Sequence, residues 1–191
     1  LMLSVGIALG LELLDKSVRT SQDIVRHLDV AMLGAIPHTD DEEVAIQRVE
    51  TAVRDHPRSL IAEAFRGIRT GLQFSAPAER QRVIIITSPR PEDGKTTVAC
   101  NLAMVVAQGG RRVLLIDGNL RRPGLQAIFP AIKAKGLSNL LIGDGSLDSF
   151  VVKTELPLLD ILGSGPLPPN PAELLGGAPC RAFLQEAASR Y

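Results

Sequence analysis

The chain has 191 residues, of which 45% are hydrophobic and 22% charged, which is enough apolar material for one globular core. Its 21 basic and 21 acidic residues cancel, so its net charge gives no electrostatic case for nucleic-acid binding. With one Tyr, no Trp and five Phe, it also offers no aromatic surface on which bases could stack.

The first 14 residues are apolar except for Ser4, Glu12 and the glycines. As a helix, this segment would cover roughly half of a ~30 Å hydrocarbon core. Lys16 and Arg19 follow directly, as expected of a cytoplasmic flank, and neither a basic region nor a cleavage site indicates a signal peptide. We interpret residues 1–14 as the inner half of a transmembrane helix. A buried N-terminal helix is the alternative.

Three elements are predicted between this segment and residue 56. Residues 20–28 form a short helix with Thr20 as N-cap. Residues 30–36 form a strand that ends before a proline, and a polar loop at 38–43 leads into a charged helix that ends near residue 55.

An amphipathic helix is predicted from about residue 57 to residue 74, because apolar side chains recur there at helical spacing. These side chains are Ile61, Ala64, Phe65, Ile68 and Leu72. Glu63, Arg66 and Arg69 lie on the other side of the helix. Considered alone, Glu63 and Arg66 form an exposed pair worth about a few tenths of a kcal/mol.

The most informative segment is the apolar run Ile84–Ile86, predicted as a buried strand, followed by a tight loop and a predicted helix at 98–107. This order is typical of a phosphate-binding loop, in which backbone N–H groups and a helix N-terminus face the anion. Lys95 would reach the β- and γ-phosphates, and the Thr96 hydroxyl would bind Mg²⁺. The candidate nucleotide-binding residues are Pro91, Glu92, Asp93, Gly94, Lys95, Thr96 and Thr97.

A second strand is predicted at 112–116 and ends at Asp117. A strand, a helix and a strand within some 35 residues indicate a βαβ unit with parallel strands. Because ligands gather at the carboxyl ends of such strands, Asp117 is a candidate to bind Mg²⁺ or to orient a nucleophile. Its alternative role is to cap the next turn.

Further along the chain, a short helix is predicted at 137–142, a buried strand at 158–162 and a helix from 172 to 190. Asn170 is expected to be the N-cap of the last helix, and contact with a nucleotide base is its less favoured role. The two cysteines have no metal spacing, and we interpret both as small buried hydrophobic residues.

Two motifs resemble those of the bacterial tyrosine kinases, the cytoplasmic ATPase modules of exopolysaccharide and capsule co-polymerases. They are Ser-Pro-x-Pro-x-x-Gly-Lys-Thr-Thr at 88–97 and Leu-Leu-Ile-Asp-x-x-Leu-Arg-Arg-Pro at 114–123, which the family calls Walker A and Walker A′. Glu-x₂-Arg-x₂-Arg at 63–69 is similar to the family's oligomerisation motif, and residues 13–20, 33–37 and 168–175 resemble its juxtamembrane and downstream segments.

The resemblance implies an α/β fold: a three-layer sandwich with a mainly parallel sheet, of the deviant P-loop type found in MinD and ParA, here incomplete. It divides the chain into the half-helix at 1–14, a juxtamembrane linker at 15–56, and an ATPase or kinase domain at 57–191 that lacks its C-terminal part. In the family a buried strand ending in Asp and a tyrosine-rich tail follow. This fragment alone is therefore expected to be inactive.

The implied activity is ATP-dependent autophosphorylation of tyrosine, with ATP and Mg²⁺ required. Lys95, Asp117 and Arg121 would be catalytic, and Thr96 and Asp117 would bind the metal. A carboxylate would orient the tyrosine hydroxyl, whose ordinary pKa lies near 10.

The resemblance also implies a place in the cell and a set of partners. The protein would lie at the cytoplasmic face of the bacterial inner membrane and form a ring-like homo-oligomer through Glu63, Arg66 and Arg69. Its partners would be the polysaccharide export and polymerisation machinery and a cognate tyrosine phosphatase, with no nucleic acid.

Four positions depart from the family's pattern. Pro89 replaces the first glycine of the standard loop, and Arg90 occupies the place of the signature lysine of MinD-type proteins. Glu92 stands where the family usually has glycine, so the backbone there is expected to avoid a positive φ. Asn119 replaces the second aspartate of Walker A′ and cannot accept a proton, which bears on kinase efficiency more than on ATP binding.

Two further hypotheses follow. A non-catalytic regulator, in which ATP binding alone sets the oligomeric state, is favoured by Asn119 and by the scarcity of tyrosine. A positioning ATPase like MinD or ParA is disfavoured by the predicted transmembrane segment.

Overall fold

The computed structural model of the protein describes residues 30–77 and 81–191. By its internal contacts the chain divides into two units, Leu1–Leu33 and Gly34–Tyr191, and every described helix and strand lies in the second. The segments predicted at 1–14 and 20–28 fall outside the described residues. Within the described ranges, no helix has the length and apolarity needed to cross a membrane.

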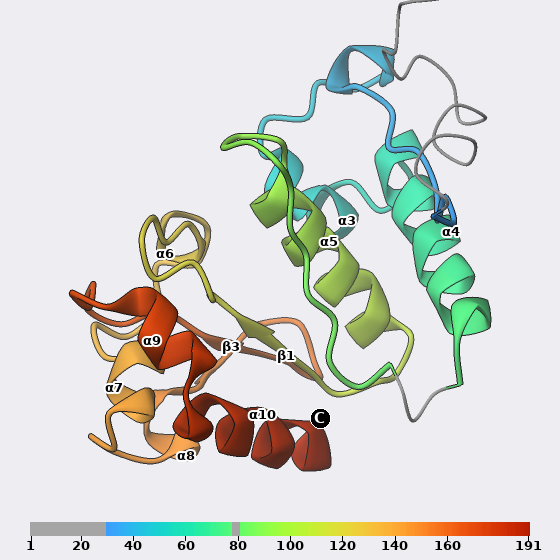
Figure 1. The fold of residues 1–191 in the computed structure, drawn as a ribbon. Coiled ribbons are helices and arrows are strands. Elements are labelled where there is room, and N and C mark those ends of the chain that lie inside the picture. The colour runs from blue at the N-terminus through green and yellow to red at the C-terminus, as the bar shows by residue number, and fades with distance from the viewer. Residues whose placement is uncertain (1–29, 78–80) are drawn as a thin grey trace, which may run out of the picture. The chain divides into compact units, whose positions relative to one another are not determined.

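The first half of the second unit is helical (Figure 1). Its elements are the 3₁₀ turns η1 (Thr39–Asp41) and η2 (Val49–Thr51), and the helices α3 (Ala52–Asp55), α4 (Leu60–Ser75) and α5 (Lys95–Gln108). The amphipathic helix predicted at 57–74 is confirmed as α4. The charged helix predicted to end near residue 55 shrinks to η2 and α3.

The strand predicted at 30–36 is wrong, since these residues form no strand. Ile36 packs against the core cluster of α4 and α5, and a Cβ atom at Gly34 would lie 2.7 Å from Ile68 Cγ1 of α4. The chain at Gly34–Ile36 therefore lies against a helix, where no strand edge is available for pairing.

The second half of the unit contains the sheet and five short or medium helices. In chain order its elements are β1 (Val113–Ile116), α6 (Leu125–Ile128), α7 (Leu137–Leu141), α8 (Leu147–Phe150), β2 (Val152–Lys153), β3 (Leu159–Leu162), α9 (Pro171–Gly176) and α10 (Ala178–Arg190). The predicted helix at 137–142 and strand at 158–162 are confirmed as α7 and β3.

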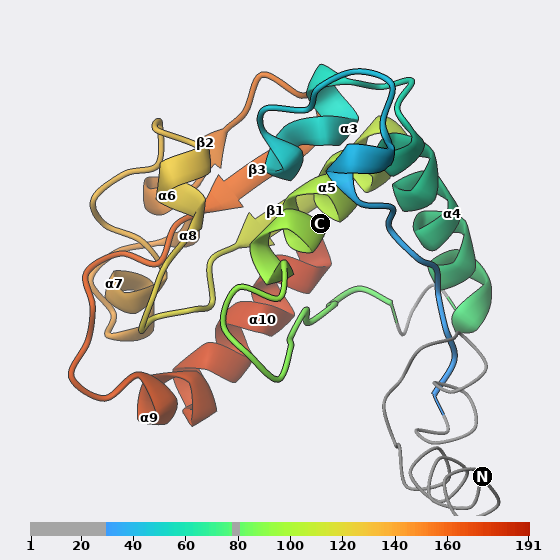
Figure 2. The ribbon, with the colours of Figure 1, turned by 90° about the horizontal axis from the view of Figure 1, so that it is seen from above.

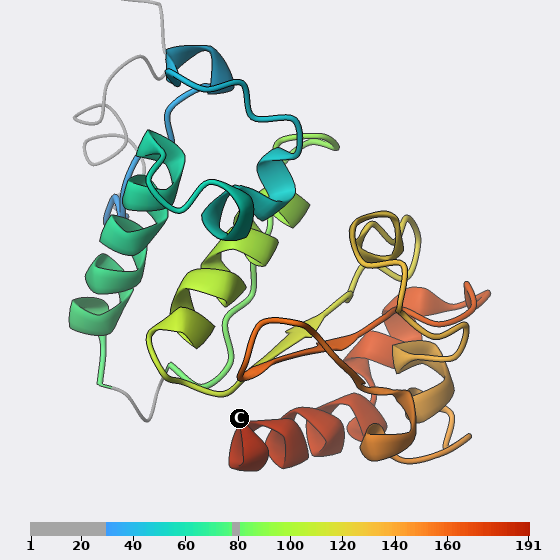
Figure 3. The same cartoon turned by 180° about the vertical axis from the view of Figure 1, so that it is seen from behind.

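The sheet has the strand order β1-β3-β2, with β1 parallel and β2 antiparallel to β3. Alternate residues of β1 enter two separate clusters, as the period of a strand requires. Leu115 packs with α4 and α5 on one face, whereas Leu114 and Ile116 pack with α7 and α10 on the other. Both faces of the short sheet are thus covered by helices (Figures 2 and 3).

The predicted C-terminal helix is divided into α9 and α10 at Gly177, which adopts an extended conformation (φ −74°, ψ 166°). Pro179 explains the break. It has no N–H to donate, and its ring would clash with the carbonyl of the preceding turn if the helix continued.

The strand predicted at Ile84–Ile86 is also wrong: the segment pairs with no strand among the described residues. Ile84 and Ile85 are 48% and 82% exposed. The only parallel pair of the described sheet is β1 with β3, so the predicted βαβ unit is absent from it. High β-propensity does not make a strand where no neighbour supplies hydrogen bonds.

Candidate phosphate-binding site

Helix α5 begins directly after Gly94, which has a left-handed conformation (φ 83°, ψ 14°). A residue with a Cβ atom adopts this conformation at a cost, so glycine suits the turn from loop to helix. Lys95 is the first residue of α5, and no side chain of the described residues caps this helix end. The free N–H groups of the first turn and the helix dipole make the end of α5 suitable for an anion.

The loop before α5 is held together by its own side chains. Lys95 Nζ donates to Ser88 Oγ at 2.5 Å and to the carbonyl oxygen of Arg90 at 2.7 Å. Asp93 Oδ2 accepts a hydrogen bond from the Arg90 amide at 2.9 Å. The Lys95 ammonium thus lies over the loop that it closes, and a bound phosphate would compete with Ser88 and Arg90 for it.

The backbone at Glu92 corrects the expectation from the sequence, because this residue does have a positive φ, at 66°. The side chain is exposed, so no packing opposes the conformation. A left-handed conformation costs a residue with a Cβ atom about 1–2 kcal/mol, which the neighbouring hydrogen bonds of the loop must offset.

Asp117 follows β1 and is 7% exposed. Its Oδ2 accepts from the amides of Gly124 and Leu125 at 2.9 and 3.0 Å, and its Oδ1 accepts from the Asn119 amide at 3.2 Å. The capping role considered from the sequence is therefore present. Three N–H groups therefore engage this carboxylate, and Oδ1, which accepts only one of them, is the less occupied oxygen.

Thr96 and Asp117 lie at the same place in the fold. A Cβ atom at Gly124 would lie 3.2 Å from Thr96 Oγ1, and the Gly124 amide donates to Asp117. The described residues contain no group of three or more His, Cys, Asp or Glu side chains that could hold a metal ion. A hydroxyl and a carboxylate are nevertheless ligands that Mg²⁺ takes when phosphate oxygens and water complete its coordination.

The remaining residues of this turn have local roles. Asn119 Oδ1 accepts from the Arg122 amide at 3.1 Å. Arg121 is exposed, and none of the hydrogen bonds or ion pairs found in the described ranges involves its side chain. The structure brings Lys95, Thr96 and Asp117 to one side of the fold but leaves Arg121 at the surface.

The Glu63, Arg66 and Arg69 motif does not act as one unit. Glu63 and Arg66 form an exposed ion pair, and Arg66 Nη2 donates to the Pro57 carbonyl at 2.6 Å. Arg69 instead points inward and donates to the Val105 carbonyl of α5 at 3.1 Å. A guanidinium suits the negative end of α5, so Arg69 joins two helices of the same chain.

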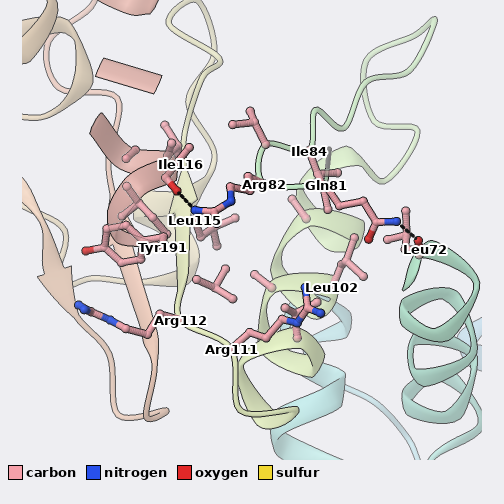
Figure 4. A pocket seen from close by; sticks show the side chains of 18 of the residues that line it. Leu72, Gln81, Arg82, Ile84, Leu102, Arg111, Arg112, Leu115, Ile116 and Tyr191 are labelled. Carbon is pink, nitrogen blue, oxygen red and sulfur yellow. Dashed lines mark hydrogen bonds between the residues drawn. The ribbon is translucent and has the colours of Figure 1, made fainter. Parts of the chain in front are cut away.

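A cavity of about 610 Å³ lies away from the phosphate-binding loop. It separates the unpaired segment at 81–86 from β1, and α4, α5 and α10 also contribute to its walls (Figure 4). Arg82 donates to the Ala188 carbonyl of α10 at 2.9 Å. The edge of β1 that faces the segment is therefore open, and Ile84–Ile86 does not pair with it because the cavity lies between them.

Two residues with structural importance for the site were missed from the sequence. Asn101 is completely buried, and its position as the one amide within the apolar run of α5 was a signal that could have found it. Glu42 accepts hydrogen bonds from the amides of Leu60 and Ile61 at the start of α4. Nothing in the local sequence indicates this contact, because the partners are 18 and 19 residues away.

The surroundings of the two thiols and of the single tyrosine raise their pKa values. Both cysteines are buried, as expected, and burial raises the pKa of Cys100 to about 12. Tyr191 donates to Asp160 Oδ2 at 2.9 Å beneath the Arg112 guanidinium. Burial, followed by the hydrogen bond to Asp160, raises the pKa of Tyr191 to about 12.

A glycine-capped helix that begins with Lys-Thr, beside an aspartate at the end of a strand, defines an α/β protein with a phosphate-binding loop. Comparisons specify the family. The tyrosine-protein kinase YwqD of Bacillus subtilis (strain 168) is 41% identical over 135 residues, which are 71% of this chain and 57% of that protein. The crystal structure of the chimerical protein CapA2B2 matches with a TM-score of 0.79 and 35% identity, over 90% of this chain and 72% of that one.

The kinase domain of the Escherichia coli tyrosine kinase ETK matches with a TM-score of 0.81 and 29% identity, over 92% of this chain and 70% of that one. A scan against models of protein families gives no match. The chain belongs to the bacterial tyrosine-protein kinases and has their P-loop fold. It spans a little more than half the length of the Bacillus relative.

Proposed function

We propose that this chain is the ATP-binding part of a protein-tyrosine autokinase that regulates the chain length and export of an exopolysaccharide or capsule. The observation that carries the proposal is the open N-terminal end of α5, where the left-handed Gly94, Lys95 and Thr96 lie close to the turn held by Asp117. The kinase relatives support phosphoryl transfer as the reaction.

The residues of the chain would act by position and charge. Amides 91–97 and the ammonium of Lys95 would bind the phosphates, after Lys95 leaves Ser88 and Arg90. Thr96 and Asp117 would hold Mg²⁺, which neutralises phosphate charge when it is bound. Asp117 would serve as a ligand or as an orienting group in preference to a base, since three amides already engage it. Arg121 would steady the site from the surface.

The test measures MgATP binding first and tyrosine phosphorylation second. Isothermal titration calorimetry of the chain with MgATP should show binding that Lys95→Ala weakens by at least tenfold, because a charge-assisted contact to phosphate is lost. Lys153→Ala removes an exposed lysine of β2 and is the matched control. Equal affinities for the wild-type protein and Lys95→Ala would refute the nucleotide site.

Kinase activity is then measured on the full-length protein in detergent with MgATP, by phosphotyrosine detection. Signal from the wild-type protein that disappears in Lys95→Ala supports the autokinase. Binding without any phosphotyrosine supports the second candidate, a nucleotide-gated regulator. Asn119 favours that candidate, because its amide closes the turn to Arg122 where an aspartate could act as a base.

The complete fold, the cellular location and the partners are also proposed from the similarity to the kinase relatives. The complete fold would be a three-layer sandwich with a mainly parallel sheet, like MinD and ParA, and the protein would lie at the cytoplasmic face of the inner membrane. It would work with the polysaccharide export and polymerisation machinery and with a cognate tyrosine phosphatase. A MinD- or ParA-like ATPase that performs no kinase reaction remains the third candidate.

A ring-like homo-oligomer would form through the surface of α4 that carries Glu63 and Arg66. Arg66→Glu is the appropriate test, because Arg69 also supports α5 within the chain. Light scattering of the full-length protein should show a smaller assembly for Arg66→Glu. Arg58→Glu, which reverses another arginine shortly before α4, is the control, and an unchanged assembly in Arg66→Glu would refute the interface.

A further inference from the structure

Asn101 is completely buried in α5, and every other residue of this helix from Val98 to Ala107 is apolar. A buried amide is costly unless its polar atoms are hydrogen-bonded. Alanine or leucine would fill this position in a helix that only needed to pack. The free-energy cost of burying the Asn101 amide is therefore explained by the groups to which the amide is hydrogen-bonded.

The amide makes three hydrogen bonds to two parts of the chain. Its Oδ1 accepts from the Val53 amide at 2.9 Å, and its Nδ2 donates to the Val49 carbonyl at 2.7 Å. The same Nδ2 donates to the Thr97 carbonyl at 3.0 Å. Asn101 thus connects the segment of η2 and α3 to the first turn of α5, the turn that begins with Lys95 and Thr96.

The segment at 49–55 has little else to hold it by polar contact. The Thr51 hydroxyl donates to Asp55 and to the carbonyl of the adjacent Arg48, and Arg54 donates to Asp55. Among the hydrogen bonds of the described residues, those of Asn101 are the only ones that connect 49–55 with α5. Ala52 and Val53 are buried in the core cluster that α4 and α5 share, so apolar packing is the other contribution that holds the segment.

We propose that Asn101 is a positioning residue of the nucleotide site, whose amide couples residues 49–53 to the first turn of α5. Order in this segment and nucleotide binding at 94–97 then favour each other. The proposal rests on the nucleotide-binding function proposed above. Since coupling between two sites is reciprocal, a nucleotide must stabilise the segment by the same factor by which the ordered segment raises nucleotide affinity.

The test combines affinity with local stability. MgATP affinity is measured by calorimetry for the wild-type chain, Asn101→Ala and Asn139→Ala. Asn139 is the matched control: it is another buried asparagine, and its amide accepts from Gly136 and donates to Asp144, on either side of α7. Hydrogen exchange of peptides that contain residues 49–53 is followed with and without MgATP.

Asn101→Ala should weaken MgATP binding by about tenfold, within the usual range of coupling between sites, whereas Asn139→Ala should stay within about twofold of the wild-type affinity. MgATP should slow exchange at 49–53 in the wild-type chain and in Asn139→Ala, and should not slow it in Asn101→Ala. A purely structural role of Asn101 would lower stability without removing this nucleotide-dependent protection.

Equal affinities for Asn101→Ala and Asn139→Ala would overturn the proposal. So would an absence of nucleotide-dependent protection at 49–53 in the wild-type chain, a result that remains decisive even if Asn101→Ala does not fold. Both outcomes leave the difference between the wild-type protein and Lys95→Ala intact. A wild-type chain that does not bind MgATP overturns the proposed function itself, and the coupling with it.

Discussion

Glu42 should contribute measurably to stability although it lies outside the helix whose amides it accepts from. The N-cap and the first three residues of α4 present four amides that no residue within the helix can accept. Ser59 N donates to the His56 carbonyl, and Ala62 N donates to Ser59 Oγ at 3.1 Å. The two remaining amides, those of Leu60 and Ile61, donate to the Glu42 carboxylate at 3.1 and 2.7 Å.

The magnitude follows from these two bonds. Loss of a helix cap costs about 1 kcal/mol, and a carboxylate at the positive end of a helix contributes a further ~0.3–1 kcal/mol. Two exposed or half-buried bonds therefore give about 2 kcal/mol for Glu42→Ala. In a domain of this size that loss lowers Tm by roughly 4–8 °C. Glu42→Gln keeps one acceptor oxygen without the charge and should lose about half as much.

The assay is urea denaturation followed by circular dichroism, with an unchanged m-value to show that only stability has changed. Glu43→Ala is the matched control, because Glu43 is an exposed neighbour of the same charge. A Glu42→Ala variant whose free energy of unfolding lies within about 0.5 kcal/mol of that control would refute the capping argument.

Three further predictions concern the loop, the unpaired segment and the tyrosine. Glu92→Gly should change the free energy of unfolding by less than about 1 kcal/mol, since the strain relieved is offset by the greater freedom of glycine in the unfolded chain. The same variant should bind MgATP more tightly in calorimetry. If Glu92→Gln binds as tightly as Glu92→Gly, loss of the negative charge is the cause. If neither variant differs from the wild-type protein, Glu92 does not face the phosphates. Amides of Ile84–Ile86 should exchange as fast as those of an unfolded peptide, because the segment pairs with no described strand, and strong protection in mass spectrometry would show that it does pair. The only tyrosine should ionise near pH 12, as followed by phenolate absorbance, and Asp160→Asn should move the transition toward pH 10. Because the folded state raises the pKa of this phenol, its contribution to stability is complete below pH 10 and lost as the pH rises through about 12; a wild-type transition at pH 10 would contradict this.

Features set by local sequence were predictable. The periodicity of α4, the apolar composition of α5 and the glycine before Lys95 each describe an element that neighbouring residues determine. The strand at Ile84–Ile86 failed for the opposite reason, since a strand exists only where a second strand lies beside it. Its residues have the right propensity, but the cavity next to β1 leaves them without that neighbour.

In the candidate site, too, features set by neighbouring residues were predictable and features set by more distant residues were not. The sequence places Lys95 and Thr96 on the first turn of a helix and Asp117 at the end of a strand, and these positions follow from short-range patterns. It does not reveal that Asp117 accepts three amides, because the turn that supplies two of them closes seven and eight residues later. It also predicts the wrong backbone at Glu92, where loop hydrogen bonds prevail over the preference of the residue.

Arg69 shows why a motif is not a functional unit until its side chains are placed. Three charged residues at a spacing of three turn by about 60° at each of two steps around a helix, so the motif covers about a third of its circumference. Glu63 and Arg66 reach solvent, whereas Arg69 reaches the carbonyl end of α5, and its Nε is buried without a partner among the described residues. A change at Arg69 consequently alters the contact between α4 and α5 before it alters any contact with another subunit. A loss of assembly in a variant changed at both arginines would report on folding and on the interface together, and only Arg66 separates the two.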